Sequence, residues 1–454
     1  MEQNAKFQMM TQTPIHILIP KLAVPTIISM LTTSIYNMAD TFFVSQIGTS
    51  AAAAVGVIFS LMAIIQAIGF TFGMGSGSFI SRSLGKKDVE NAEKAGAIAF
   101  FSAIAMGLLL ALFGLLFIDR LVIMLGATET IAPYAKDYGK YILIGAPYMC
   151  GSFVLNNILR SQGNAVRSML GITTGGILNI ILDPIFIFGF DMGISGAAIA
   201  TIISQLISFI ILLVQCNYID GSIKIKVSNF RFSMEMYKEI LKTGMPTFYR
   251  QGLASFSTIL MNISASPFGD SAIAAVSIVT KIIMFINSVL IGFGQGYQPV
   301  CGFNYGAKKY DRVLEAFWFC AKVAFIGLST FALIGFIFAP DIIAVFRAND
   351  AEVIQIGSRT MRFQCMAMPI YSFTVIVNMT LQSLGYGWRG SLVASGRQGL
   401  FFIPLILILP RIIGITGIQS SQAIADFFTF LLAIALITDV LKELKEKSKE
   451  MEKI

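Results

Sequence analysis

Residues 169–190 read MLGITTGGILNIILDPIFIFGF, a run whose only strongly polar side chains are Asn179 and Asp183. About 20 apolar residues in a helix cross the ~30 Å hydrocarbon core of a bilayer, so the run predicts a membrane-spanning helix. A carboxylate inside such a helix costs about 2.5–3.5 kcal/mol on insertion scales. Asn179 precedes Asp183 by four residues and shares its helix face, and Pro184 removes a backbone donor beside the acid. We interpret Asp183 as a functional residue; a purely structural role is the alternative.

The whole chain has the composition of an integral membrane protein. Hydrophobic residues make up 56% and charged residues 13% of its 454 positions, with a mean hydropathy of +0.76, whereas a soluble domain carries about 25% charged residues. We predict twelve membrane-spanning helices and an all-α fold. The predicted spans are 17–43, 51–80, 94–117, 138–160, 168–189, 195–216, 238–266, 271–300, 313–338, 360–384, 391–410 and 414–440.

The distribution of basic residues predicts the topology. The net charge is +8, which taken alone is compatible with nucleic-acid binding. With the twelve spans in place, we assign 23 of the 33 Lys and Arg residues, Arg397 among them, to the side of the N-terminus and seven to the other side. The positive-inside rule then places both termini in the cytoplasm of a multi-pass protein of the cell membrane. We therefore expect no nucleic-acid partner.

The second half of the chain repeats the pattern of the first. The repeated positions keep one offset in the numbering, constant to within a single position, which we call the repeat offset: Pro25 and Pro246, Gly48 and Gly269, Gly75 and Gly296, Asn156 and Asn378, Arg167 and Arg389, and Gly193 and Gly414. Such a constant offset indicates a duplicated unit of six helices. Because six is even, both units face the same way, and a pseudo-two-fold axis along the membrane normal relates the two bundles. We predict an N-lobe at 1–219, a cytoplasmic linker at 220–242 and a C-lobe at 243–454.

Several patterns argue against an enzyme or a cofactor protein. The five cysteines have no metal or redox spacing, and His16 is the only histidine. The glycine-rich segments 73–77 and 294–296 lie inside predicted membrane helices, without the strand and lysine of a phosphate loop, so we interpret them as close helix contacts. No nucleophile–base pair is visible. We expect neither an enzymatic activity nor a cofactor.

Four polar residues of the first half are predicted to meet at one depth. Asp40 and Asp183 fall in the outer halves of spans one and five, Asn179 lies beside Asp183, and Thr201 opens span six from the same side. Their oxygens would suit a sodium ion. The same group would also suit a proton, because burial and like charge both raise the pKa of a carboxyl group. For Asp40, a hydrated helix end at the outer interface is the alternative.

The second half carries a different set of charges within its spans. Arg250, Lys281 and Arg397 are basic, and Asp426 is an available counter-charge. We expect a structural ion-pair network among them. A role in substrate selection or in coupling the lobes remains open.

The chain resembles the multidrug and toxic compound extrusion (MATE) family along its whole length, most closely the DinF-like and MepA-like bacterial members. The motifs that carry the resemblance are YNMAD at 36–40, NNILRSQG at 156–163, LNIILDP at 178–184, GISGAA at 193–198 and the prolines Pro25 and Pro246. The resemblance implies two six-helix bundles in a V and export of organic cations coupled to the entry of a cation. In the family, the helix equivalent to span one is proposed to bend at Pro25 when the site is protonated.

The resemblance also implies roles for individual residues. The cation-binding residues of this branch correspond to Asp40, Asn179, Asp183 and Thr201, which would form a metal site only if the coupling ion is sodium. The substrate-binding positions correspond to Tyr36, Tyr138 and Asn156, with Asn157 as a rival for Asn156. Another branch has acids in helices seven and ten; the corresponding spans here lack them, which argues against a sodium site in the C-lobe.

We therefore expect an antiporter that is driven by protons or sodium and exports amphipathic, mostly cationic drugs by alternating access, as in antibiotic resistance. Its partners would be these small molecules and membrane lipids, and we expect a monomer. The alternative is a lipid-linked oligosaccharide flippase of the wider MOP superfamily, for which Arg250, Lys281 and Arg397 would supply a cationic cleft. A passive channel is a third reading, which a duplicated bundle with a one-sided acidic site suits poorly.

Overall fold

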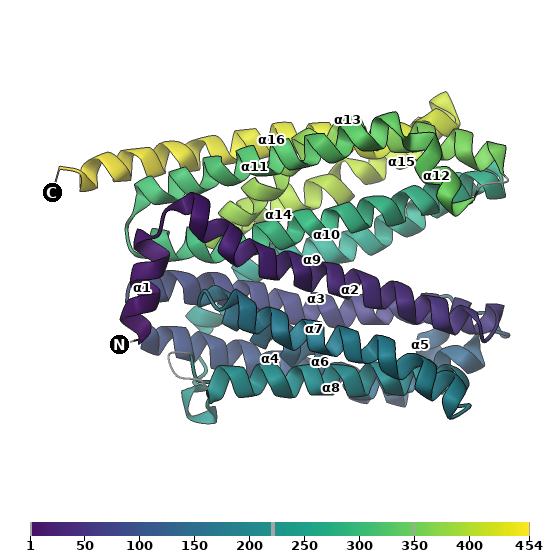
Figure 1. The fold of residues 1–454 in the computed structure, drawn as a ribbon, viewed down its shortest axis with the longest axis horizontal. Helices are drawn as coiled ribbons and strands as arrows, with labels where there is room; N and C mark the ends of the chain where they lie inside the picture. The colour runs from purple at the N-terminus through teal and green to yellow at the C-terminus, as the bar shows by residue number, and fades with distance from the viewer. Residues whose placement is uncertain (1, 219–222, 348–349, 454) are drawn as a thin grey trace.

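The computed structural model describes residues 2–218, 223–347 and 350–453, and every regular element in these ranges is a helix. The first half forms the N-lobe (Figure 1). Its long helices are α2 (Ile15–Ser45), α3 (Thr49–Gly85), α4 (Val89–Leu116), α6 (Ala132–Ser161), α7 (Ala165–Pro184), which continues as the π-helix η1 (Ile185–Gly189), and α8 (Gly193–Asn217).

The second half forms the C-lobe and repeats this order. Its helices are α9 (Met234–Ala265), α10 (Asp270–Gly306), α11 (Tyr310–Ile337), α13 (Ala351–Leu384), α14 (Gly387–Ser395), the π-helix η4 (Gly396–Leu400), α15 (Phe402–Ile413) and α16 (Ile415–Met451). Eleven helical segments in the described ranges are long and apolar enough to cross a membrane. The remaining predicted span, α9, is a continuous helix of 32 residues whose polar side chains, Arg250 and Gln251 among them, lower its hydropathy. The prediction of an all-α membrane fold is confirmed.

Several short elements were not predicted. The polar lead forms α1 (Glu2–Gln12), and the short helices α5 (Ile118–Met124) and α12 (Ala339–Phe346) follow α4 and α11. The 3-10 turns η2 (Val227–Asn229) and η3 (Ser266–Phe268) lie in connections. Span eleven is interrupted by η4, and α9 begins at Met234, within the range predicted as linker. Since the first residues of α5 and α12 are separated by the repeat offset, even these short helices belong to the duplicated unit.

One hydrogen bond is repeated in the two lobes and documents the duplication at atomic level. Asn156 Nδ2 on α6 donates to the carbonyl oxygen of Ser168 on α7 at 3.2 Å. Its counterpart Asn378 on α13 donates to the carbonyl oxygen of Gly390 on α14 at 2.7 Å. Donor and acceptor of the second bond are both the repeat counterparts of those of the first. The two asparagines therefore perform the same helix-joining task.

The lobes cross each other at two equivalent points, each marked by a glycine. On α3, a Cβ atom at Gly75 would collide with the carbonyl oxygen of Ile240 on α9. On α10, a Cβ atom at Gly296, the counterpart of Gly75, would collide with the backbone of Ala23 on α2. Small residues allow such close backbone approach between membrane helices. The interpretation of the glycine-rich segments as helix contacts is confirmed.

At these crossings, each hydrophobic core includes side chains from the leading helix of the other lobe. Ile15, Leu18 and Ile19 at the start of α2 are buried in the core of the C-lobe, although the rest of α2 packs against α7 in the N-lobe. Ile240 near the start of α9 is buried in the core of the N-lobe. Each lobe therefore holds the first turns of the other lobe's leading helix, which joins the lobes firmly at this end.

In the described part of the chain, the contacts between the lobes are concentrated toward the end of the molecule where the two termini lie (Figure 1). We call these contacts the seam; Thr26 Oγ1 donates to the Gly292 carbonyl oxygen there at 2.6 Å, and Arg82 forms an ion pair with Glu239 at 2.8 Å. Among described residues, Ser34 and Ser288, 2.8 Å apart, make the interlobe hydrogen bond farthest from the termini. Beyond it the described parts of the lobes are not hydrogen-bonded to each other, and apolar side chains of α2 and α10 are exposed, namely Ile35, Met38, Phe42, Met284 and Phe285.

Candidate functional site

The two acidic residues of the N-lobe lie at the far ends of their helices, away from the seam. Asp40 is on the last turns of α2, and Asp183 is the penultimate residue of α7, before Pro184 and the π-helix η1. Pro184 has no N–H to donate and so favours a change of helical pitch at this point. Asp40 is 7% exposed and Asp183 is fully buried, so both carboxylates lie inside the bundle.

Asn179 links Asp183 to α8. Its Nδ2 atom donates to Asp183 Oδ1 at 3.0 Å and to Thr201 Oγ1 at 3.3 Å. The spacing of four residues on α7 thus has the predicted consequence, since the amide and the acid lie on one helix face and face α8 together. Asn179 and Thr201 are themselves 1% and 3% exposed.

Tyr138 connects Asp40 to this group. Its hydroxyl on α6 donates to Asp40 Oδ2 at 3.2 Å, and the same hydroxyl also interacts with Thr201 and Asp183. The two carboxylates are close enough to interact electrostatically. The structure therefore brings together all four residues predicted for the cation site and adds Tyr138, which the resemblance assigned to the substrate.

Three acceptor oxygens of this cluster have no donor. Within the described chain, Asp40 Oδ1, Asn179 Oδ1 and Asp183 Oδ2 are buried and make no hydrogen bond. Buried polar atoms without a partner are rare in folded proteins, because each costs about 1–3 kcal/mol. All three are acceptors, two of them on carboxylates, so the donor set fits a cation that accepts oxygen ligands or a proton.

The predicted substrate residues lie in different surroundings. Tyr36 is buried on α2, and its hydroxyl accepts a hydrogen bond of 3.5 Å from Gln205 on α8, a residue that the sequence analysis did not single out. Asn156 faces α7, where it also donates to Ser168 Oγ at 2.6 Å. Its rival Asn157 faces the seam and accepts from Arg160. Asn156 and Asn157 thus point to different sides of α6. The sequence alone did not show which of the two faces the substrate.

Of the ion-pair network predicted for the C-lobe, one pair is found in the described part of the chain, and neither Arg250 nor Lys281 belongs to it. Arg397 Nε donates to Asp426 Oδ1 at 2.8 Å, and Gln422 Nε2 donates to the same oxygen at 3.0 Å. Arg397 was assigned to the inner basic residues, but it lies on η4 inside the bundle; the excess of basic residues on the inner side survives its removal. Lys281 is exposed on α10 and lies outside this pair.

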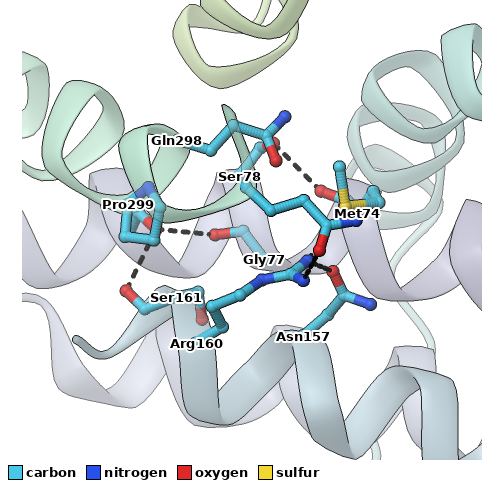
Figure 2. Close-up of a pocket in the computed structure, with 10 residues that line it drawn as sticks. Met74, Gly77, Ser78, Asn157, Arg160, Ser161, Gln298 and Pro299 are labelled. Carbon is cyan, nitrogen blue, oxygen red and sulfur yellow. Dashed lines mark hydrogen bonds between the residues drawn. The ribbon is translucent and has the colours of Figure 1, made fainter. Parts of the chain in front are cut away.

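A small polar cavity of about 20 Å³ lies at the seam, between α3, α6 and α10 (Figure 2). The buried guanidinium of Arg160 on α6 donates to Asn157 in its own lobe and to Gln295 in the other lobe. Figure 2 shows Gln298 and Pro299 of α10 across the cavity from Arg160 and Ser161. The cavity has room for about one water molecule. Two equivalent segments of the two lobes line the cavity: the repeat offset relates Met74 of α3 to Gln295 of α10, and Gly77 to Gln298.

The fold and the buried acidic cluster define a multi-pass membrane protein with two six-helix lobes and a polar site inside the first lobe. The MatE family model matches residues 25–185 and 246–408, once in each half. The chain therefore belongs to the MatE family, as the sequence motifs indicated.

Individual relatives resemble the chain over nearly its whole length. The multidrug export protein MepA of Staphylococcus aureus (strain MSSA476) is 27% identical over 436 residues, which cover 94% of each chain. A structure described as the outward-facing conformation of a multidrug resistance MATE transporter superposes with a TM-score of 0.88 at 25% identity and covers 96% of this chain and 99% of its own. A MOP superfamily transporter of Pyrococcus furiosus, described as having a binding pocket of reverse polarity, superposes with a TM-score of 0.90 at 26% identity and covers 97% of this chain and 98% of its own.

Proposed function

We propose that the protein is an antiporter that exports amphipathic, mostly cationic drugs in exchange for protons or sodium ions. The observation that carries the proposal is the set of three donorless acceptor oxygens on Asp40, Asn179 and Asp183. Two charged carboxylates side by side are costly inside a membrane protein when neither has a counter-ion. A bound cation would remove that cost, so the acidic cluster of the N-lobe is suited to bind one.

Coupling follows if the cation and the drug prefer different conformations, since a ligand shifts an equilibrium only by its difference in affinity. With both termini in the cytoplasm, the closed seam faces the cytoplasm and the structure corresponds to the outward-open state. The similarity to an outward-facing MATE transporter supports this assignment. Cation binding at Asp40 and Asp183 would favour drug release to the outside. Opening of the seam would give the alternate access.

Each chain contains both lobes and a complete acidic cluster, so we propose that it acts as a monomer in the cell membrane, without a cofactor and without enzymatic activity. The similarity to MepA, a multidrug export protein, supports the choice of drugs as substrates.

The experiment is drug transport in proteoliposomes, with pH and sodium gradients imposed separately. Asp183→Asn removes one carboxylate of the cluster and should fold but lose gradient-driven ethidium export. Asp191→Asn is the matched control, because Asp191 is exposed just beyond η1. Export by Asp183→Asn at the wild-type rate would refute the assignment of the site. Export that needs neither gradient would refute the antiport mechanism.

The flippase alternative draws on the basic residues of the C-lobe. Asp426 neutralises Arg397, and Lys281 stands apart, so the buried part of this region carries one excess positive charge. One charge suits a pyrophosphate group poorly. Binding of a polyprenyl diphosphate, together with failure to bind any drug, would nevertheless favour the flippase over the exporter.

A further inference from the structure

Two arginines in the interior of the C-lobe interact with the same tyrosine, Arg397 by contact with its ring and Arg250 electrostatically. The Arg397 guanidinium carbon lies 3.9 Å from the centre of the Tyr371 ring, a close cation–π contact. Arg250 on α9 interacts electrostatically with the same tyrosine, on α13. We call Arg250, Tyr371 and Arg397 the basic cluster.

The described part of the protein neutralises only one of the two positive charges of the basic cluster. Asp426 binds Arg397 through Nε only, so the terminal nitrogens of that guanidinium keep no hydrogen bond to the described residues. No carboxylate in the described part of the chain lies within ion-pair distance of Arg250. Arg250 is half-buried, and the Arg397 side chain is 15% exposed. Ionisable side chains within membrane helices almost always face the bundle interior or a water-filled cavity, and we therefore assign the exposed part of the basic cluster to the side that faces the interior of the protein.

The duplication places the basic cluster at the level of Tyr36 in the N-lobe. The register is set by two equivalent contacts: a Cβ atom at Gly175 would lie 2.8 Å from Ser208, and one at Gly396 would lie 3.0 Å from Thr429. The repeat offset relates each member of the first pair to its counterpart in the second, so Gly176 corresponds to Arg397.

The same offset relates the neighbouring residues. Gln205, which binds Tyr36 in the N-lobe, corresponds to Asp426, which binds Arg397 in the C-lobe. A Cβ atom at Gly176 would lie 3.2 Å from the Tyr36 ring. The C-lobe has the small Ser257 as the counterpart of Tyr36 and the large Arg397 as the counterpart of the glycine. At this depth the N-lobe has a large residue on its first helix and a glycine on its fifth, whereas the C-lobe has a small residue on the first and a large one on the fifth. The site is therefore neutral and aromatic in the N-lobe and cationic in the C-lobe.

We propose that Arg250 and Arg397 bind a single oxyanion, a carboxylate, sulfate or phosphate group, on a transported amphiphile. Arginine is suited to this task because its planar fork donates two parallel hydrogen bonds to such groups. One excess positive charge matches one anionic group. The inference rests on the proposed export function and extends its substrate class to zwitterionic and anionic amphiphiles. The apolar part of the substrate would occupy the space between the lobes, as for a cationic drug.

The test is equilibrium binding of two matched fluorescent probes to the full chain in phosphatidylcholine nanodiscs. Dansylglycine carries a carboxylate, and dansylethylenediamine carries an ammonium group. A charged hydrogen bond contributes about 1.5–3 kcal/mol, so Arg250→Gln should weaken dansylglycine binding by about tenfold or more and leave the amine probe unchanged or tighter. Arg411→Gln removes an exposed charge at the end of α15 and should change neither affinity.

Arg397→Gln alone would leave Asp426 buried without its partner and is open to misfolding. The double variant Arg397→Gln/Asp426→Asn removes both charges and should also lose dansylglycine selectively. Unchanged dansylglycine binding in both arginine variants, or an equal loss of both probes, would overturn the anion site.

Two further comparisons separate the possible outcomes. Nanodiscs that contain phosphatidylglycerol identify the source of the anion: a lipid headgroup at the site would lower the apparent dansylglycine affinity only in these discs, and an unchanged affinity would assign the site to a soluble amphiphile. Because no gradient is imposed, the result is independent of coupling. A protein that binds dansylglycine through its arginines but exports nothing would keep the anion site and lose the proposed function. Ethidium export without discrimination between the probes would refute the anion site alone.

Discussion

The hydroxyl of Tyr138 on α6 donates a hydrogen bond to Asp40 Oδ2 on α2 at 3.2 Å. The resemblance assigned Tyr138 to the substrate, but this bond makes it a direct partner of the acidic cluster. A donor to a carboxylate stabilises its charged form against protonation. If the cluster binds a proton, as proposed above, Tyr138 would oppose that binding and favour release of the proton.

Tyr138→Phe should bind a proton at the acidic cluster more tightly. The loss of one charged hydrogen bond, about 1.5–3 kcal/mol, should lower the proton concentration that gives half-maximal drug exchange by about tenfold or more, and it should not tighten the binding of sodium in the same way, because the carboxylate stays charged when sodium is bound. Drug exchange in proteoliposomes over a range of pH and of sodium concentration measures the change and identifies the coupling ion. Tyr134→Phe, one turn earlier and exposed, is the control. A changed drug KM with an unchanged ion dependence would return Tyr138 to the substrate site.

Asn179→Leu should uncouple the transporter. The substitution removes the donor shared by Asp183 and Thr201, and Asp183 would keep no hydrogen bond in the described protein. We expect loss of gradient-driven export together with a fall in stability of about 1–3 kcal/mol, because a buried acceptor loses its partner. Thermal unfolding in detergent and ethidium export measure the two effects. Thr174→Val on the exposed face of α7 serves as the control. Wild-type export by Asn179→Leu would mean that the amide is not needed for ion binding.

Gly296→Val should hold the seam open. A side chain at Gly296 meets the backbone of Ala23, and overpacking of this kind costs about 1–3 kcal/mol. We expect faster maleimide labelling from the cytoplasmic side of a cysteine introduced at Ser78, beside the seam cavity, and a loss of export. Gly252→Val is the matched control, because no atom lies within 4 Å of a Cβ placed there. Equal labelling of the two valine variants would argue against the seam as the gate.

Met10→Ala should weaken the contact between the lobes at the seam by removing a side chain of α1. Met10 on α1 is fully buried in the C-lobe core; its carbonyl oxygen accepts from Asn304 at 3.0 Å, and its sulfur would lie 3.2 Å from a Cβ at Gly163 of the N-lobe. The helix α1 thus contacts both lobes. A buried methionine truncated to alanine costs about 2–5 kcal/mol, so labelling of the cysteine at Ser78 should rise. Met451→Ala, at an exposed position of α16, should leave it unchanged.

Much of the acidic cluster was predictable because its residues follow helical periodicity. The spacing of four between Asn179 and Asp183 places both on one face of any helix, and consecutive membrane helices joined by short connections run in opposite directions. The links between helices were less accessible. The sequence does not say that Tyr138 reaches Asp40, or that Asn156 faces α7 while Asn157 faces the seam, because a rotation of α6 by part of a turn would reverse these choices.

The apolar runs, the repeat offset and the buried acids were sufficient to determine an all-α membrane protein with two repeated lobes, since hydrocarbon admits only long helices whose backbone groups bond within themselves. Only the tertiary structure decided which lobe each segment serves: Ile15 and Leu18 of the first membrane helix fill the C-lobe core, and Ile240 of the seventh fills the N-lobe core. It also decided which charges meet, because the ion pair of Arg397 with Asp426 and the lack of one at Arg250 within the described chain depend on packing between helices distant in the sequence. Sequence periodicity specifies the faces of a helix, whereas close packing against its neighbours selects the partner of each face.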